Sequence, residues 1–76
     1  MDENAFLDEL ADALQMEREA ARPALELDPD TWDSMEIMEG IALVDEMAGI
    51  TLPAGEMAGC RSVGQLLDLI TSKLDA

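Results

Sequence analysis

The stretch DSMEIMEGIALVDEMAG, residues 33–49, decides the fold because it contains a helix start, an amphipathic pattern and a helix stop. Asp33 and Ser34 are both favoured helix caps, and Glu36 is placed to close a capping box on Asp33. At about 100° per residue, one arc of this helix carries core side chains at Ile37, Ile41, Val44 and Ala48. Gly49 supplies the left-handed residue that commonly ends a helix. The sequence therefore predicts an amphipathic helix that begins near Asp33 and ends at Gly49.

Two further helices flank this stretch, one on each side. Residues 4–16 carry apolar side chains three and four positions apart, at Phe6, Leu7, Leu10 and Leu14. Near the other end, Ser62 and Gln65 have the spacing of a capping box. Apolar residues follow them at helical spacing, at Val63, Leu66, Leu67, Ile70 and Leu74. We expect one helix in each of these segments.

A short third helix is predicted between the two long ones of the second half of the chain. Gly55 precedes residues 56–60 and Gly59 lies near their end, which leaves room for little more than one helical turn. Met57 and Cys60 are expected to face inward from this turn. Without a histidine to activate it, Cys60 is interpreted as a small core residue and not as a nucleophile.

Residues 17–32 are predicted to form a long ordered loop. They contain two prolines, which remove helical hydrogen bonds and clash with the preceding turn. Leu25 and Leu27 alternate with polar neighbours and are expected to pin the loop onto the core. Trp32, directly before the helix start, is interpreted as the loop's anchor. A loop of this length in a small domain usually has a function.

Together these elements predict the fold class. It is all-α: a small four-helix bundle of three main helices plus a short third helix, with the long loop between the first two. The 76 residues form one domain, and a chain of this size buries only roughly 60% of the surface that its unfolded form exposes. A deep active-site cleft is therefore not expected, and neither is an enzyme.

The charge of the chain restricts its partners. Eighteen acidic residues against four basic ones give a formal net charge of −14, which repels nucleic acids and anionic membranes and attracts basic protein surfaces. No basic, apolar leader opens the chain, and no stretch is long and apolar enough to span a membrane. We expect a cytoplasmic monomer. The main hypothesis includes no metal site, because the chain lacks histidine, the commonest metal ligand.

The outer face of the helix at residues 33–49 combines exposed apolar and acidic side chains. These residues, which we predict to bind a partner, are Met35, Met38, Glu39, Ala42, Asp45 and Glu46. Ser34 heads the same helix, where unpaired N–H groups and a partial positive charge favour a phosphate ester. We therefore interpret Ser34 as a modification site.

An alternative hypothesis is a non-covalent binding module in which Ser34 only caps the helix. It would be an acidic adaptor or would respond to calcium. The calcium version depends on oxygen-bearing side chains at positions 1, 3, 7, 9 and 12 of an EF-hand-like frame, namely Asp28, Asp30, Ser34, Glu36 and Glu39. The match is partial, since Asp33 stands where the sharp turn of such a loop needs glycine.

From Trp32 to Leu74 the chain resembles an acyl carrier protein. The resemblance depends on Asp33-Ser34-Met35 in place of the family's usual Asp-Ser-Leu, and on Glu39 with the aliphatic residues that follow it. It continues through Asp45-Glu46 and through an apolar residue with a proline at Leu52-Pro53, and ends with Ser62-Val63 at the start of the last amphipathic helix. No insertion or deletion separates these landmarks.

The resemblance implies a covalent cofactor and a set of partners. Ser34, preceded by Asp33, would receive 4′-phosphopantetheine from coenzyme A through a phosphopantetheinyl transferase. Acyl or aminoacyl groups would then travel as thioesters among an acyl-loading ligase or transferase, ketosynthase-type enzymes and other biosynthetic enzymes with basic docking patches. The pathway, whether fatty acid, polyketide or aminoacyl, and the acyl group stay open. Thr31-Trp32, where the family often has a glycine, departs from the fatty-acid type and favours a carrier of a specialised pathway. Ala48 stands where fatty-acid carriers tend to have Phe, which implies an inner cavity of different shape.

Overall fold

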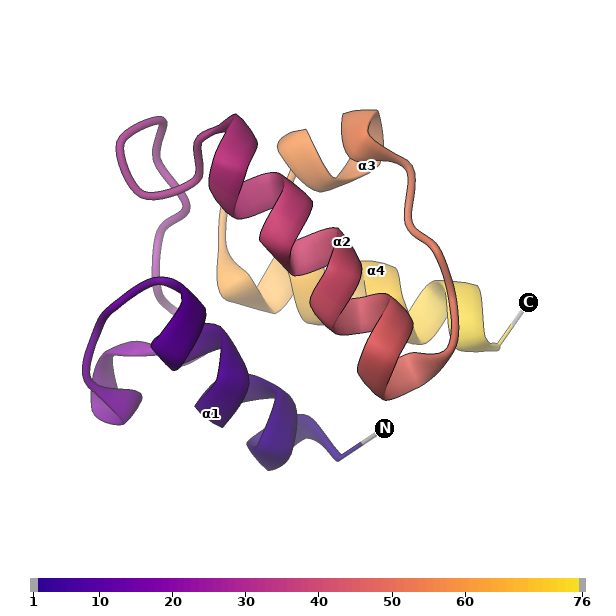
Figure 1. Cartoon of the computed structure of the whole chain (residues 1–76), viewed down its shortest axis with the longest axis horizontal. Coiled ribbons are helices and arrows are strands. Elements are labelled where there is room, and N and C mark those ends of the chain that lie inside the picture. Colours follow the sequence, from indigo (N-terminus) through magenta and orange to yellow (C-terminus); the bar gives the residue numbers. More distant parts are fainter. Residues whose placement is uncertain (1, 76) are drawn as a thin grey trace.

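The computed structural model describes residues 2–75 and shows a small all-α bundle, as predicted. Its helices are α1 (Glu3–Ala13), α2 (Ser34–Ala48), α3 (Ala54–Ala58) and α4 (Val63–Leu74), with one 3₁₀ turn at Arg18–Ala20 (Figure 1). The part of the chain described contains no strand, only an isolated bridge between Glu26 and Ser62. The predicted arrangement of three main helices and a short third one is confirmed.

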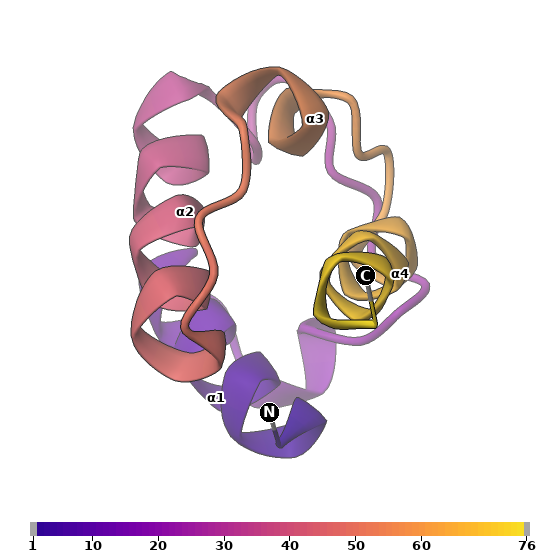
Figure 2. The same ribbon diagram turned by 90° about the vertical axis from the view of Figure 1, so that its right-hand side faces the viewer.

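The four helices surround one apolar core. Figure 2 shows α2 and α4 on opposite sides, with α1 below and α3 above. The largest fully buried side chains come from all four helices and the α2–α3 connection: Phe6, Leu10, Val44, Leu52, Met57, Val63, Leu66 and Ile70. Of the predicted core arc of α2, Val44 is fully buried, and the others, Ile37, Ile41 and Ala48, are half-buried against the core.

The end of α1 differs from the prediction. The helix ends at Ala13 and not at Met16, because Gln15 takes a left-handed conformation with φ of 56°. The N–H groups of Gln15 and Met16 then donate to the carbonyls of Asp12 and Ala11, as in a Schellman motif. Glutamine rarely adopts the left-handed conformation that ends a helix. Neither its residue type nor the apolar pattern therefore indicated that the helix ends at Ala13. At the other end of the same helix, Asp2 caps the N–H groups of Asn4 and Ala5.

The long loop runs beside the start of α4 and bonds to it. The N–H of Leu27 donates to the carbonyl of Arg61 at 2.9 Å, and the N–H of Val63 donates to the carbonyl of Leu25 at 3.0 Å. The N–H of Gly64 donates to the carbonyl of Pro23 at 2.9 Å. Leu27 is buried and Leu25 is half-buried. The prediction that these leucines pin the loop is confirmed.

The capping box predicted for α4 and the short helix α3 are both present, but each differs from the prediction in detail. Ser62 caps α4 by accepting from the N–H of Gln65 at 3.2 Å, but the Gln65 side chain accepts from the N–H of Arg61, one residue before the expected partner. The short helix begins earlier than predicted, at Ala54, directly after Pro53. Met57 and Cys60 are buried, as expected.

No helix among residues 2–75 has the length and hydropathy that a membrane span requires.

Candidate functional site

The site predicted from the sequence lies where the long loop meets α2, at the upper left of Figure 1. Asp28 shapes the turn before it, because its carboxylate accepts the N–H of Thr31 at 2.8 Å and its carbonyl accepts the N–H of Trp32 at 2.7 Å. The hydrogen bonds from Thr31 lower the pKa of the Asp28 carboxyl. This turn delivers the chain to the helix start in a fixed direction.

Trp32 anchors the helix start to the core, as predicted. It is only 5% exposed, and its indole Nε1 donates to the carbonyl oxygen of Met57 at 2.8 Å. The indole lies over Gly40: a Cβ atom there would come within 2.8 Å of Trp32 Cη2 and 3.0 Å of Met57 Cε. Gly40 therefore makes room for the anchor. Gly40 was not among the residues predicted from the sequence, although a glycine inside an amphipathic helix commonly has a packing reason.

Asp33 and Ser34 have different roles at the start of α2. Asp33 is the N-cap, with extended backbone and a carboxylate that accepts the N–H of Glu36 at 2.9 Å. Ser34 is the first helical residue and is exposed. Within residues 2–75 its hydroxyl makes no hydrogen bond. The helix cap that the alternative hypothesis assigned to Ser34 is therefore wrong, because Asp33 caps the helix; the acidic adaptor itself stays a prediction.

Carboxylates surround this helix start. Burial raises the pKa of Glu36, and the neighbouring carboxylates of Glu39 and Asp33 add to the effect. The Glu36 Oε2 atom is buried and has no hydrogen-bond partner among the described residues, so the second half of the predicted capping box does not form. The free hydroxyl of Ser34 thus lies in a strongly acidic environment at the positive end of a helix dipole.

The outer face of α2 is exposed as predicted. Met35 and Met38 are 66% and 69% exposed, large values for apolar side chains. A shallow groove of about 570 Å³ contains these two methionines together with Ser34, Glu39 and Ala42. Asp45 and Glu46 are exposed farther along the helix. The structure therefore brings the hydroxyl and most of the predicted partner-binding residues onto one continuous surface.

An acidic groove between α1 and α2 was missed from the sequence. It has a volume of about 260 Å³, and its carboxylates come from both helices: Glu9, Asp12, Glu39 and Glu46. The only available signal was that Glu9 and Asp12 lie on the polar side of α1. Which helix that side borders depends on packing, and packing is not encoded locally.

The calcium frame is not assembled. The Asp28 carboxylate is used within its own turn, and Trp32 lies buried in the middle of the frame. In the part of the chain that the structure describes, no three side chains of the types that bind metals are grouped to hold an ion.

The chain matches no family model, no curated protein and no solved structure.

Proposed function

We propose that the chain is a carrier protein that holds an acyl or aminoacyl group as a thioester on a 4′-phosphopantetheine arm attached to Ser34. The observation that supports this most directly is the state of Ser34: an exposed hydroxyl in the first turn of α2, without a hydrogen-bond partner among residues 2–75. A serine needed only for structure would be expected to cap the helix. Here Asp33 does so, which leaves the Ser34 oxygen free for an external enzyme.

The attachment chemistry is consistent with the helix start. The Ser34 oxygen would attack the phosphorus that bears the pantetheine, the pyrophosphate bond of coenzyme A would break, and the nucleotide portion would leave. The Ser34 proton would pass to a base of the transferase. The resulting phosphodiester would gain from the partial positive charge at the start of α2, although the carboxylate of Asp33 opposes it.

The surface next to Ser34 suits transient partners. Met35 and Met38 offer flexible apolar contacts, and the carboxylates of Glu39, Asp45 and Glu46 surround them. Enzymes with basic patches would be drawn to this surface by long-range electrostatic attraction. The contacts would be brief because the apolar area is small. An arm that reaches from Ser34 keeps the carried group at high effective concentration for each enzyme in turn.

Intact-mass analysis tests the proposal. The purified chain is incubated with coenzyme A, magnesium and a broad-specificity phosphopantetheinyl transferase, and we expect a gain equal to one phosphopantetheine. The gain should vanish in Ser34→Ala and persist in Ser72→Ala, a matched control at another exposed serine. Absence of the gain, under conditions that modify a known carrier, would exclude the proposed function and leave the acidic adaptor.

A further inference from the structure

Another groove lies behind the helix start and is distinct from the outer face of α2 and from the acidic groove between α1 and α2. It has a volume of about 300 Å³, at the small end of the range for ligand pockets, which is roughly 300–1,000 Å³. Its walls come from the loop, α2, the end of α3 and the segment after it, and most of the residues are apolar: Leu27, Pro29, Trp32, Ile37, Ala58, Gly59, Cys60 and Arg61. We call it the Arg61 groove.

The Arg61 groove lies close to Ser34 along the chain. Trp32 precedes Ser34 by two positions and Ile37 follows it by three, and both line the groove. Because Ile37 lies one helical turn from Ser34, one end of the groove is within reach of any flexible group attached to the serine. The opposite side is formed by Cys60 and Arg61.

Among the described residues that line this groove, Arg61 alone is charged. Its backbone is fixed, since its N–H donates to Gln65 Oε1 at 2.7 Å and its carbonyl accepts from Leu27. Its side chain is exposed and forms no ion pair with any residue between positions 2 and 75, whereas Arg18 and Lys73 pair with Asp8 and Glu56. Arg22 likewise forms no ion pair within residues 2–75, but it does not line the groove.

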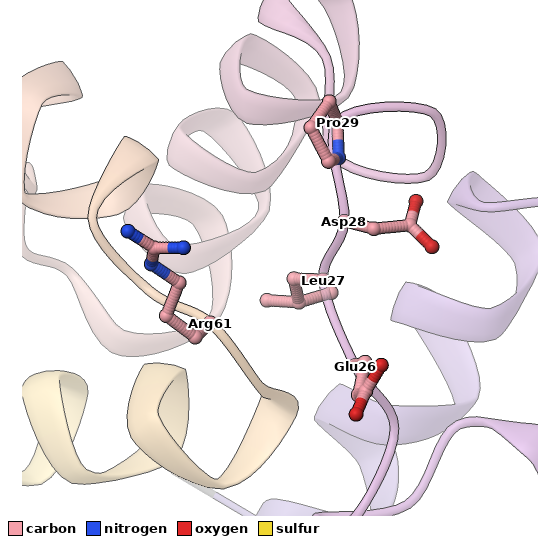
Figure 3. Close-up of a pocket in the computed structure, with 5 residues that line it drawn as sticks. All are labelled: Glu26, Leu27, Asp28, Pro29 and Arg61. Carbon is pink, nitrogen blue, oxygen red and sulfur yellow. The ribbon is translucent and has the colours of Figure 1, made fainter.

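The nearest acidic residues of the loop do not neutralise Arg61. Figure 3 shows the guanidinium on one side of the loop backbone and the Asp28 carboxylate pointing to the other side, with Glu26 farther along the loop. Glu26 and Asp28 border a neighbouring hollow that Arg61 also lines, and Leu27 lies between. These carboxylates would repel a free anion from solution. An anion delivered by a tether would overcome this repulsion through its high effective concentration.

We propose that the Arg61 groove receives the end of the Ser34 arm and that Arg61 there pairs with a carboxylate on a short carried acyl group. This inference rests on the proposed function. The guanidinium can bind a carboxylate through two parallel hydrogen bonds, and the apolar walls accommodate the methylene groups of the acyl chain. The small volume limits the group to a short chain. The carrier would thus favour half-acids of short dicarboxylic acids over neutral acyl groups of equal length.

The test compares two loaded forms of the protein. The transferase attaches arms whose thioester is replaced by a stable amide, carrying either a glutaryl group or a pentanoyl group of the same carbon number. The readout is the NMR shift of the Trp32 indole N–H and of the backbone N–H groups of Cys60 and Arg61. We expect the glutaryl form to occupy the groove about threefold more than the pentanoyl form, an effect of the size of an exposed ion pair.

Three variants make the test specific. Arg61→Gln should reduce the glutaryl shifts to the pentanoyl level, and Arg61→Lys should retain part of them because the charge is kept. Arg22→Gln removes an exposed arginine that does not line the groove and should change nothing. Equal shifts for both acyl groups, or glutaryl shifts that survive Arg61→Gln, would overturn the inference but leave the carrier function intact. A chain that never acquires the arm, as judged by mass, would overturn both.

Discussion

Asp33 and Ser34 are adjacent polar residues, yet only one of them contributes to the fold. The Asp33 carboxylate satisfies a first-turn N–H of α2, and the Ser34 hydroxyl satisfies none within the described chain. We therefore expect Asp33→Ala to lower the free energy of unfolding by about 1 kcal/mol. Ser34→Ala should stay within about 0.5 kcal/mol of the wild type. Urea denaturation of the unmodified proteins measures both; a Ser34→Ala loss as large as that of Asp33→Ala would contradict these roles.

Glu36 makes stability depend on pH. Its pKa is raised above the usual 4.5, so the folded chain holds this proton more tightly than the unfolded chain does. The corresponding stability is fully present below pH 4.5 and is lost as the pH rises through the raised value. We expect the stability of Glu36→Gln relative to the wild type to increase between about pH 4 and pH 7.

The measurement is chemical denaturation of both proteins across this pH range. Glutamine also removes a negative charge that the helix dipole favours, worth about 0.3–1 kcal/mol, so the absolute difference between the proteins is less informative than its change with pH. A difference that stays constant, or moves in favour of the wild type as pH rises, would show that folding does not raise the pKa of Glu36.

The packing of α2 against the loop depends on the absence of a side chain at Gly40. A Cβ atom at this position would push against the ring of Trp32 and the end of Met57. We expect Gly40→Ala to lower the free energy of unfolding by about 1–3 kcal/mol, in spite of alanine's better helix propensity. Tryptophan fluorescence should report the displaced ring. The effect extends to the site because Trp32 fixes the position of Ser34.

Gly55 provides the matched control. It lies in α3, and a Cβ atom there would meet nothing within 4 Å. Gly55→Ala should therefore stabilise the protein by about 0.5–1 kcal/mol, the ordinary gain of alanine over glycine in a helix. If both substitutions had the same sign, helix propensity alone would explain them and the close contact at Gly40 would be unimportant.

Elements with local signals could be predicted from the sequence, and those set by distant contacts could not. The start and end of α2 were found because Asp33 and Gly49 carry their own signals, and Gly49 indeed has φ of 73°. The end of α1 was missed because Gln15 adopts a conformation that its residue type disfavours. The exposed face of α2 could be predicted from the helical period of its apolar residues. The Arg61 groove could not, because folding brings three segments together to form it.

The distribution of charge over the molecule is strongly uneven. Within residues 2–75, two ion pairs use half of the four cationic side chains: Arg18 with Asp8 holds the 3₁₀ turn to α1, and Lys73 with Glu56 joins α4 to α3 at 3.2 Å. All four of these side chains are partly exposed, so each pair contributes about 0–1 kcal/mol. Most carboxylates therefore have no cation to offset them, and they repel one another.

This repulsion predicts that simple salt stabilises the fold. The molecule measures 30 × 24 × 19 Å, so at about 0.01 M salt, where the screening length is roughly 30 Å, carboxylates on opposite sides still repel each other. Near 1 M the screening length is roughly 3 Å, and only neighbouring charges interact. Screening weakens the two ion pairs as well, but the net charge of −14 means that repulsive pairs dominate. We expect the thermal midpoint to rise by several degrees between these sodium chloride concentrations at neutral pH, with a smaller rise near pH 4, where many carboxylates are protonated. A midpoint that is unchanged or falls with salt at neutral pH would mean that the unfolded chain repels itself as strongly as the folded one.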